Sequence, residues 1–414
     1  MTIKPYENVE KLYNRFEELY GETTDWQKKR YADLFDVFKK KFSVNEAYFA
    51  SSSGRVEVCG NHTDHNGGKV VSATISLDTL AAFLPTDDDV ITISSEGYED
   101  FSVELNKDAT EEKGTSAALV KGVCVGLKNA GYKIGGFKAK ITSNVVGGAG
   151  ISSSASFEVL IAEIISFLYN DGKVSDEEKA KVSQFAESEF FGKPCGLLDQ
   201  TAIAFGGLNR LDFKDNKKIA VKRIDSEILG KYTFVLINTG GSHANLTEEY
   251  AAIPKEMFSV AAIFNKDRLI DVSEADFYKK LPKIVGKVSD RAILRAIHFY
   301  SENTRVDNLC DALFNGNEAG FLDSIKNSGL SSAIYLQNCK VDTNADQLIV
   351  RALAVTEKFL CGGVNRVHGG GFAGTILCVV KNDKLDYFIK NVSEFYDKKA
   401  IIPLKIRKVG TIVL

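Results

Sequence analysis

The chain has little of what marks several large classes of protein. Only 6 of its 414 residues are proline, and no low-complexity or Pro-rich segment occurs. No run of residues approaches the roughly 18 to 20 apolar residues of a membrane span. Residues 1–8 also lack the apolar stretch of a signal peptide. These absences argue against disordered, fibrous and membrane-spanning classes, and we expect a cytoplasmic protein.

An excess of charge of one sign is lacking as well. The chain has 52 basic and 55 acidic residues, a formal net charge of -3, so no overall basic field would attract nucleic acid or an anionic membrane. We therefore expect neither as a partner. The seven cysteines are odd in number, scattered and never spaced as Cys-x-x-Cys, which favours reduced thiols over a disulfide framework or a zinc site.

What is present is ordinary globular material, 44% hydrophobic with 34 glycines, and long enough for two domains. Ser175 and Glu178 form a capping-box pattern and Gly192 suits a helix end, which predicts a helix between Ser175 and Gly192. We place a domain boundary near residue 210. Other segments have helix, strand or turn patterns: an amphipathic helix in the first fifty residues, a strand over 70–77, loops at 86–89 and 106–114, a hairpin over 208–221 and a strand over 234–238.

Residues 144–156 form a Gly-rich and Ser-rich loop that leads into an apolar helical pattern. Glycines let backbone amides approach a phosphate, and hydroxyls would follow where a helix amino terminus concentrates positive potential. Neither a Walker A loop nor a Gly-x-Gly-x-x-Gly fingerprint matches, and a serine-rich loop that only caps a helix is the alternative. The candidate ATP-binding residues are Gly147, Gly148, Gly150, Ser152, Ser153, Ser154, Ala155 and Ser156.

Residues 54–68 hold an unusual density of polar side chains between glycines. Asn61, His62 and Asp64 offer the mixed donors and acceptors that a carbohydrate site needs. Arg55 would stabilise charge on a transferring phosphoryl group. Two alternatives stay open: a satisfied polar turn, or a metal site. The metal site would use His62, Asp64 and His65 with one of the other histidines, which are His243, His298 and His368.

Two further segments carry chemistry. Asp199 follows a Gly-containing turn and is a candidate catalytic base, because a hydroxyl that attacks phosphorus must lose its proton. Glu187, on the preceding helix, would reach a magnesium ion. Residues 366–374 contain three consecutive glycines and precede an apolar strand pattern, which favours a loop that approaches a ligand or a tight turn.

Taken together, these segments resemble the GHMP small-molecule kinases, and within them the galactokinase branch. Residues 54–67 resemble the signature Gly-Arg-x-Asn-Leu-Ile-Gly-Glu-His-x-Asp-Tyr-x-Gly, and residues 146–156 resemble Pro-x-Gly-x-Gly-Leu-Ser-Ser-Ser-Ala-Ser. Residues 195–200 resemble Cys-Gly-Ile-Met-Asp-Gln, and residues 369–374 resemble Gly-Gly-Gly-Phe-Gly-Gly. The resemblance implies a two-lobed α/β (α+β) GHMP kinase fold. Its active site would lie in the cleft between an N-terminal ribosomal-protein-S5-like lobe, residues 1–210, and a C-terminal α+β lobe, residues 211–414.

The resemblance also implies roles for single residues. Arg55 and Asp199 would be the catalytic pair, and Ser154 and Glu187 would bind Mg²⁺. The substrates would be ATP and a monosaccharide, galactose, phosphorylated at its C1 hydroxyl. The side chains and backbone that would face the sugar are Asn61, His62, Asp64, Gly196 and Tyr250, the last matched through residues 242–250.

Four departures from the family pattern stand out: the first two named below bear on the substrate, and the last two affect the rigidity of loops more than the chemistry. Asn61 stands where the signature has Glu, His65 where it has Tyr, Val146 where it has Pro, and Ala373 where it has Gly. An amide in place of a carboxylate weakens a contact to a sugar hydroxyl from roughly 1.5–3 to roughly 0.5–1.5 kcal/mol. This keeps open a kinase for N-acetylgalactosamine, arabinose or a uronic acid. A sugar sensor without turnover is a second alternative, and the intact serine loop, Arg55 and Asp199 argue against it.

Overall fold

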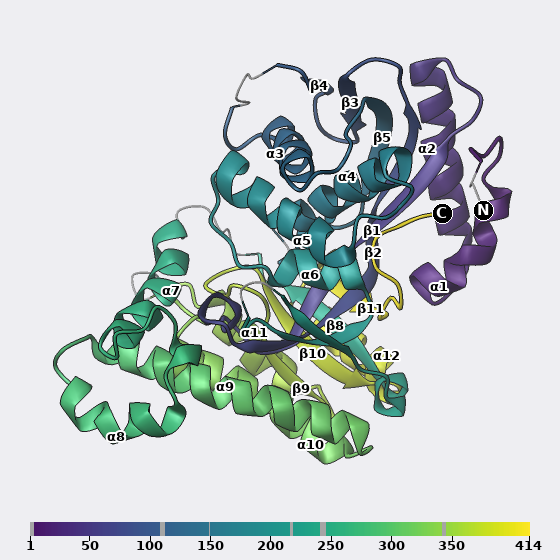
Figure 1. Cartoon of the computed structure of the whole chain (residues 1–414). Coiled ribbons are helices and arrows are strands. Elements are labelled where there is room, and N and C mark those ends of the chain that lie inside the picture. The colour runs from purple at the N-terminus through teal and green to yellow at the C-terminus, as the bar shows by residue number, and fades with distance from the viewer. Residues whose placement is uncertain (1–3, 108–111, 149, 216–217, 241–245, 342–344) are drawn as a thin grey trace.

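Two β-sheets with helices packed on their faces make up the fold (Figure 1). The computed structural model describes residues 4–107, 112–148, 150–215, 218–240, 246–341 and 345–414. None of the helices in this part of the chain combines the length and the apolar character needed to cross a bilayer. All seven cysteines are free thiols, as predicted.

The first sheet has eight strands in the order β12-β1-β2-β5-β3-β4, with β6 paired to β2 and β7 to β6. Its centre is the long antiparallel pair of β1 and β2, and only β3 and β5 run parallel. The C-terminal strand β12 returns to pair with β1. The strands of this sheet are β1 (Tyr48–Cys59), β2 (Lys69–Pro85), β3 (Val90–Ser95), β4 (Phe101–Glu104), β5 (Phe137–Ser143), β6 (Leu208–Asp212), β7 (Ala220–Arg223) and β12 (Ile412–Val413).

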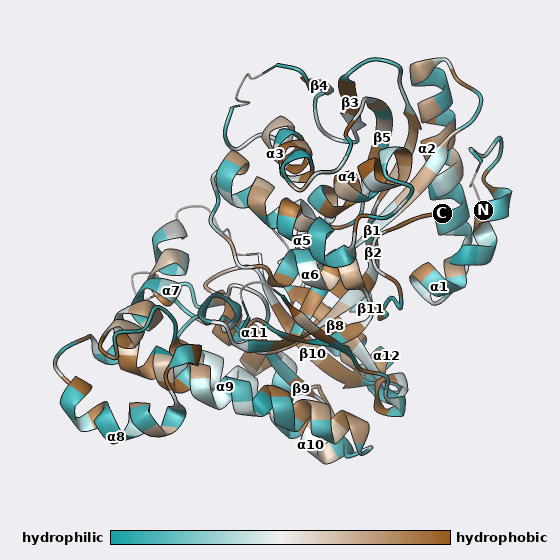
Figure 2. Cartoon of the chain, in the orientation of Figure 1, coloured by the Kyte–Doolittle hydropathy of each residue, from teal (hydrophilic) through white to brown (hydrophobic). Residues whose placement is uncertain are grey.

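The second sheet is antiparallel, in the order β11-β8-β10-β9. Side chains alternate between the faces of a strand, so Phe234 and Leu236 pack toward α9 and α10, and Val235 and Ile237 pack toward α11 and α12. Figure 2 shows β8 and β10 in brown, as expected of strands buried on both faces. The strands are β8 (Tyr232–Asn238), β9 (Val364–Val367), β10 (Thr375–Lys381) and β11 (Ile401–Leu404).

Helices cover both faces of the first sheet. Ala81 and Phe83 of β2 join a core with α3, α4 and α5, and Leu80 and Ala82 join a core with α2 on the opposite face. Helices α7, α8 and α9 share a further core in the C-terminal half. The helices are α1 (Phe16–Tyr20), α2 (Asp25–Phe42), α3 (Ser116–Asn129), α4 (Ser153–Tyr169), α5 (Asp176–Phe185), α6 (Leu198–Phe205), α7 (Thr247–Ala262), α8 (Glu274–Ile284), α9 (Asp290–Phe314), α10 (Glu318–Ser331), α11 (Leu348–Glu357) and α12 (Leu385–Val392).

The helix predicted between Ser175 and Gly192 is confirmed, with one difference. The Ser175 side chain accepts the Glu178 backbone N–H at 3.2 Å, and Gly192 ends the helix with a φ of 87°. The last six residues, Ala186–Phe191, form a π-helical segment rather than a continued α-helix. A hydrophobic pattern does not separate the two, because both keep the same side chains near the core.

The strands predicted at 70–77 and 234–238 are confirmed within β2 and β8, and the hairpin over 208–221 is formed by β6 and β7. Residues 216–217 of its turn lie outside the described residues. In the first fifty residues the predicted helix is divided: a 3-10 segment, Glu10–Arg15, is followed by α1, and Gly21 in the left-handed region separates α1 from α2. The predicted boundary near residue 210 falls inside β6 and stays a prediction.

Candidate active site

Arg55 and Asp199 are in direct contact, although 144 residues separate them. The Nε and Nη2 atoms of Arg55 each lie 2.8 Å from Oδ1 of Asp199. Nη1 of Arg55 donates to the carbonyl of Gly150. The arginine side chain is 7% exposed and the aspartate side chain 33%. The structure therefore brings Arg55 and Asp199 together beside the serine-rich loop, with a buried cation that holds a partly open carboxylate.

An irregularity in β1 presents Arg55 to the loop. The register of β1 against β2 shifts between Ser53 and Arg55, and such bulges re-aim side chains next to active sites. The backbone N–H of Arg55 donates to Ile151 O at 3.2 Å. A Cβ at Gly54 would lie 2.8 Å from the same carbonyl, so only glycine lets β1 and the loop approach this closely.

The serine-rich loop ends at the amino terminus of α4, which no side chain of the described residues caps. Ser152, the N-cap of α4, has a φ of 65°, and its side chain makes no capping bond. The Ser152 hydroxyl instead donates to Oδ2 of Asp199 at 2.5 Å. The first N–H groups of a helix lack intrahelical partners and carry the positive end of the dipole. The start of α4 therefore fits an anion such as a phosphate.

Not every predicted loop residue faces outward. A Cβ at Gly148 would meet no atom within 4 Å, which agrees with an open position on the loop. Ser153 is half-buried, whereas Ala155 is fully buried and offers only its backbone. The Ser156 hydroxyl is fully buried and donates to Ser52 O at 2.9 Å, so it supports β1 rather than pointing to solvent.

A buried carboxylate pair lies behind the loop. The Ser154 hydroxyl donates to Oε1 of Glu187 at 2.9 Å, and Lys193 Nζ lies 2.8 Å from the same oxygen. Gln200 Nε2 donates to Glu187 at 2.8 Å and to Glu158 at 3.2 Å. Oε1 of Glu158 is buried and has no hydrogen-bond partner in the described part of the chain. Burial, and then the charge of Glu187, raises the pKa of Glu158 well above its usual range.

Glu187 lies in the π-helical segment, and π-turns often occur at functional sites. Sequence reasoning had found Glu187 but missed both this turn and Glu158. One signal was available for Glu158, because it stands four residues after Ser154, on the same face of an otherwise apolar helix.

Asp64 lies against the segment that carries Asp199. A Cβ at Gly196 would lie 1.8 Å from Oδ2 of Asp64, so no other residue fits at position 196 in this conformation. Burial, and then the charge of Asp199, raises the pKa of Asp64 to about 6. The structure thus brings together two residues that had been predicted to face the sugar from separate motifs.

His62 and Tyr250 both bind the triple-glycine turn. His62 has a φ of 54°, and its Nε2 lies 3.0 Å from Gly370 O, which as a carbonyl can only accept. Burial lowers the pKa of His62 to about 4. The Tyr250 hydroxyl donates to Gly371 O at 2.8 Å, and a Cβ at Gly370 would lie 2.6 Å from the tyrosine ring. The glycine turn is therefore packed between the predicted sugar-facing residues.

Asn61 is fully buried and saturated by protein partners. Its Nδ2 donates to Glu57 Oε1 at 2.9 Å and to Gly369 O at 2.8 Å. Its Oδ1 accepts from Asn338 Nδ2 at 2.8 Å and from Ser332 Oγ at 3.2 Å. An amide has two donors and two lone pairs, so this side chain would have to lose a partner to bind a ligand hydroxyl.

Comparison with known proteins supports one family throughout. Residues 36–85 match the galactokinase galactose-binding signature, and residues 118–207 match the N-terminal domain of GHMP kinases. A galactokinase of Clostridium tetani is 31% identical over 84% of this chain and 87% of its own length. A galactokinase of Pyrococcus furiosus is 33% identical over 80% of this chain and 89% of its own. The chain belongs to the galactokinase family.

Solved structures agree with this membership. The structure of Lactococcus lactis galactokinase complexed with galactose superposes with a TM-score of 0.80 at 25% identity, and covers 93% of this chain and 100% of its own. The mevalonate kinase of Methanococcus jannaschii superposes with a TM-score of 0.60 at 16% identity, covering 86% of this chain and 98% of its own. The predicted GHMP kinase fold is confirmed.

The galactokinase signature also exposes a residue that sequence reasoning missed. Glu57 occupies the position where the signature has Asn, four residues before Asn61, where it has Glu. Glu57 is 3% exposed and accepts from Arg366 Nη2 at 2.9 Å. The His368 ring accepts the backbone N–H of Glu57 at 3.1 Å. Position 57 is therefore a further departure from the family pattern, beside the four named above.

The alternative metal site built on His62, Asp64 and His65 finds no support in the described residues. They contain no group of three or more His, Cys, Asp or Glu side chains placed to hold a metal ion. His298 is 2.8 Å from Asn61 O and 2.9 Å from Ser331 Oγ, so both its ring nitrogens are used. His243 lies outside the described residues.

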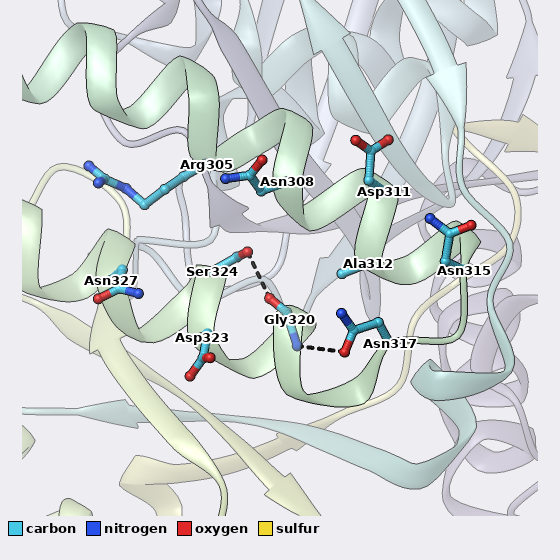
Figure 3. Close-up of a pocket in the computed structure, with 10 residues that line it drawn as sticks. All are labelled: Arg305, Asn308, Asp311, Ala312, Asn315, Asn317, Gly320, Asp323, Ser324 and Asn327. Carbon is cyan, nitrogen blue, oxygen red and sulfur yellow. Dashed lines mark hydrogen bonds between the residues drawn. The ribbon is translucent and has the colours of Figure 1, made fainter.

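A polar hollow lies between α9 and α10, and none of the predicted site residues lines it. Arg305, one of its lining residues, lies 2.7 Å from Glu302, a carboxylate that accepts the Gly60 N–H at 2.9 Å. Figure 3 shows its lining residues, which are Arg305, Asn308, Asp311, Ala312, Asn315, Asn317, Gly320, Asp323, Ser324 and Asn327.

Proposed function

We propose that this chain is an ATP-dependent sugar kinase that transfers the γ-phosphoryl group of ATP to the C1 hydroxyl of galactose, giving galactose 1-phosphate and ADP. The observation that carries the proposal is the contact of Arg55 with Asp199 beside an uncapped helix amino terminus. Membership of the galactokinase family supports the same reaction.

The phosphates of ATP would lie on the glycines of residues 147–150 and on the free N–H groups at the start of α4. Ser152, Ser153 and Ser154 border this position. The amide of Ala155 contributes through the backbone, and Ser156 supports the loop from below.

Ser154 and Glu187 would hold Mg²⁺. Their hydroxyl and carboxylate oxygens suit this hard cation, and the unpartnered buried oxygen of Glu158 adds a third oxygen beside them. Mg²⁺ in kinases commonly takes one or two carboxylates together with substrate phosphates. When bound, it supplies positive charge that neutralises the phosphate oxygens.

Arg55 would act on the transferred phosphoryl group, and Asp199, which it contacts, would act on the attacking hydroxyl. The Arg55 guanidinium is fixed by its bonds to Asp199 and Gly150, so it would stabilise developing charge on the phosphoryl oxygens without reorganising. Among the described residues, one hydroxyl donates to Oδ2 of Asp199, so a second lone pair can accept the proton of the sugar hydroxyl or orient it.

The sugar would bind against Asp64, Gly196, His62 and Tyr250. The neutral His62 ring and the Tyr250 hydroxyl are already committed to the glycine turn, so they shape the wall of the site. Asp64 offers carboxylate oxygens beside Asp199. Asn61 would support this wall rather than touch the sugar, because its four hydrogen-bonding positions are used.

A panel of free sugars with ATP and Mg²⁺ tests the proposal. Galactose should give the highest rate of ADP release, with ³¹P NMR showing a phosphate ester at the anomeric carbon. N-acetylgalactosamine, arabinose and galacturonic acid are the comparison substrates. A higher kcat/KM for one of them, or binding of galactose and ATP without ADP release, would contradict the proposal.

A further inference from the structure

In two departures from the galactokinase signature, the same two residue types have exchanged positions. The signature has Asn at position 57 and Glu at position 61, and this chain has Glu57 and Asn61. Neither the amide nor the carboxylate has been lost, because each stands where the other would be. The two side chains are hydrogen-bonded to each other, Nδ2 of Asn61 to Oε1 of Glu57, at 2.9 Å.

The pair joins three segments that are far apart in the sequence. Glu57 also receives Nη2 of Arg366 at 2.9 Å, and Arg366 is fully buried. Asn61 also holds Gly369 O and the side chain of Asn338. The segment that carries Glu57, Asn61 and His62 is therefore held to the glycine turn, which His62 contacts. The link is made through one carboxylate and one amide.

Electrostatics makes the two positions interdependent. Two amides at 57 and 61 would leave the Arg366 guanidinium buried without its anionic partner, which is strongly destabilising. Two carboxylates would place like charges at hydrogen-bond distance beside that one guanidinium. One carboxylate and one amide give the cluster one negative charge for Arg366 and an amide N–H that the carboxylate can accept, in either order of the two residues.

We propose that Glu57 and Asn61 are a reciprocally exchanged pair that acts as one positioning unit. This unit holds the segment that carries it against the glycine turn. The loss of a carboxylate at position 61 is balanced at position 57, so Asn61 by itself does not mark a change of sugar. The statement about the sugar depends on the proposed function, whereas the coupling between the two side chains does not.

A double-mutant cycle tests the pair, with Glu57→Asn, Asn61→Glu and the double variant. Each single variant should lower the midpoint of urea unfolding and lower kcat/KM for galactose by about tenfold or more. The double variant should return to within about threefold of the parent, a coupling within the range of directly contacting groups. The milder variant Asn61→Asp should raise KM for galactose while KM for ATP stays within about twofold.

Glu99→Asn is the matched control, because Glu99 is exposed. It should match the parent in both measurements. Losses in the double variant equal to the product of the single losses would overturn the proposal, and so would a single variant with parental unfolding and kinetics. If the single variants are insoluble, a soluble and active double variant supports the pair, and an insoluble double variant overturns it. A parent that is inactive on galactose would refute the proposed function, while the unfolding cycle would still report the coupling.

Discussion

Two clusters that join the first sheet to neighbouring helices and loops use the same functional groups for different ends. In one, Asp199 accepts hydrogen bonds from Arg55 and Ser152. In the other, Asp78 accepts from Arg30 Nη1 at 2.5 Å and from the Ser51 hydroxyl. The Asp199 side chain is 33% exposed and the Asp78 side chain 0%. The same kinds of donor thus leave one carboxylate partly open to a ligand and enclose the other.

The enclosed cluster has more partners because it receives groups from both chain termini. Tyr20 donates its hydroxyl to Asp78 at 2.7 Å, and the buried Arg407 lies 3.9 Å from the same carboxylate. Burial alone would raise the pKa of Asp78, but Arg30 and Arg407 outweigh burial and lower it. Arginine–aspartate contact by itself is therefore no sign of catalysis, and the open face of the carboxylate is what separates the two clusters.

The arginines should give the largest contrast. Arg55→Ala removes the cation that would face the phosphoryl group, and we expect kcat to fall by about 10³ to 10⁵. Arg30→Ala leaves Asp78 buried with less compensation, and we expect unfolding to become easier by about 3–5 kcal/mol with turnover per folded molecule near the parent value. ADP release and urea unfolding measure the two effects. An Arg55→Ala protein with more than a tenth of parental turnover would remove the distinction.

The aspartates should follow the same division with a smaller effect. Asp199→Asn keeps the shape but loses the proton acceptor, and we expect kcat to fall by about 10² to 10⁴. Asp78→Asn should cost about 3–5 kcal/mol of unfolding free energy, since Arg30 and Arg407 lose their anionic partner. The same two assays apply. Equal kinetic losses in both variants would mean that exposure does not decide function here.

Carboxylates in the two regions should respond to pH with opposite sign. The pKa of Asp64 is raised to about 6, so its contribution to stability is fullest below the unfolded value of about 3.9 and is lost as the pH rises through 6. Asp64→Asn should therefore gain stability relative to the parent between pH 4 and pH 7, by at most about 3 kcal/mol. The lowered pKa of Asp78 gives a contribution that is present above about pH 4 and lost in acid. Urea unfolding at four pH values measures both, and a difference between Asp64→Asn and the parent that does not change with pH would contradict the first.

The serines should give the smallest contrast. Ser152→Ala removes one hydrogen bond to the Asp199 carboxylate, and a bond to a charged group, worth about 1.5–3 kcal/mol, corresponds to a loss in kcat of roughly ten- to hundredfold. Ser51→Ala leaves a buried carboxylate with one donor fewer, and we expect a loss of about 1–3 kcal/mol in unfolding free energy with unchanged kinetics. A thermal scan beside the kinetic assay separates them, and a Ser152→Ala protein with only a stability defect would place both serines in the same class.

Local pattern predicted much of the fold. The β-branched run in β2, the buried strand β8 and the cap at Ser175 each depend on neighbouring residues, and each was found where expected. The division of the first helix at Gly21 and the π-helical segment at Ala186–Phe191 were missed. Both keep the helical spacing of apolar residues, so periodicity does not reveal them.

In the site as well, a local sequence pattern does not predict contacts between residues far apart in the chain. Motifs located Arg55 and Asp199 because each lies in a distinctive segment. The partner of Glu57 is Arg366, 309 residues away, and no local signal joins them. Asn61 was predicted to contact sugar because its residue type and position suggested it, and only the folded chain shows that its amide is already saturated. Hydrogen-bond satisfaction is a property of the assembled core.

The length of β2 has a mechanical consequence. Its 17 residues span about 55 Å at roughly 3.3 Å each, and β1 pairs with it from Tyr48 to Cys59. One end of this ribbon lies in the core with α3 and α4, and the other lies in the core with the second sheet. Both cores are therefore attached to the same pair of strands, so a change in their relative position would have to bend this ribbon. Arg55 lies at the register shift within this ribbon. The strand on each side of Arg55 is held in a core, and this fixes the direction of its side chain.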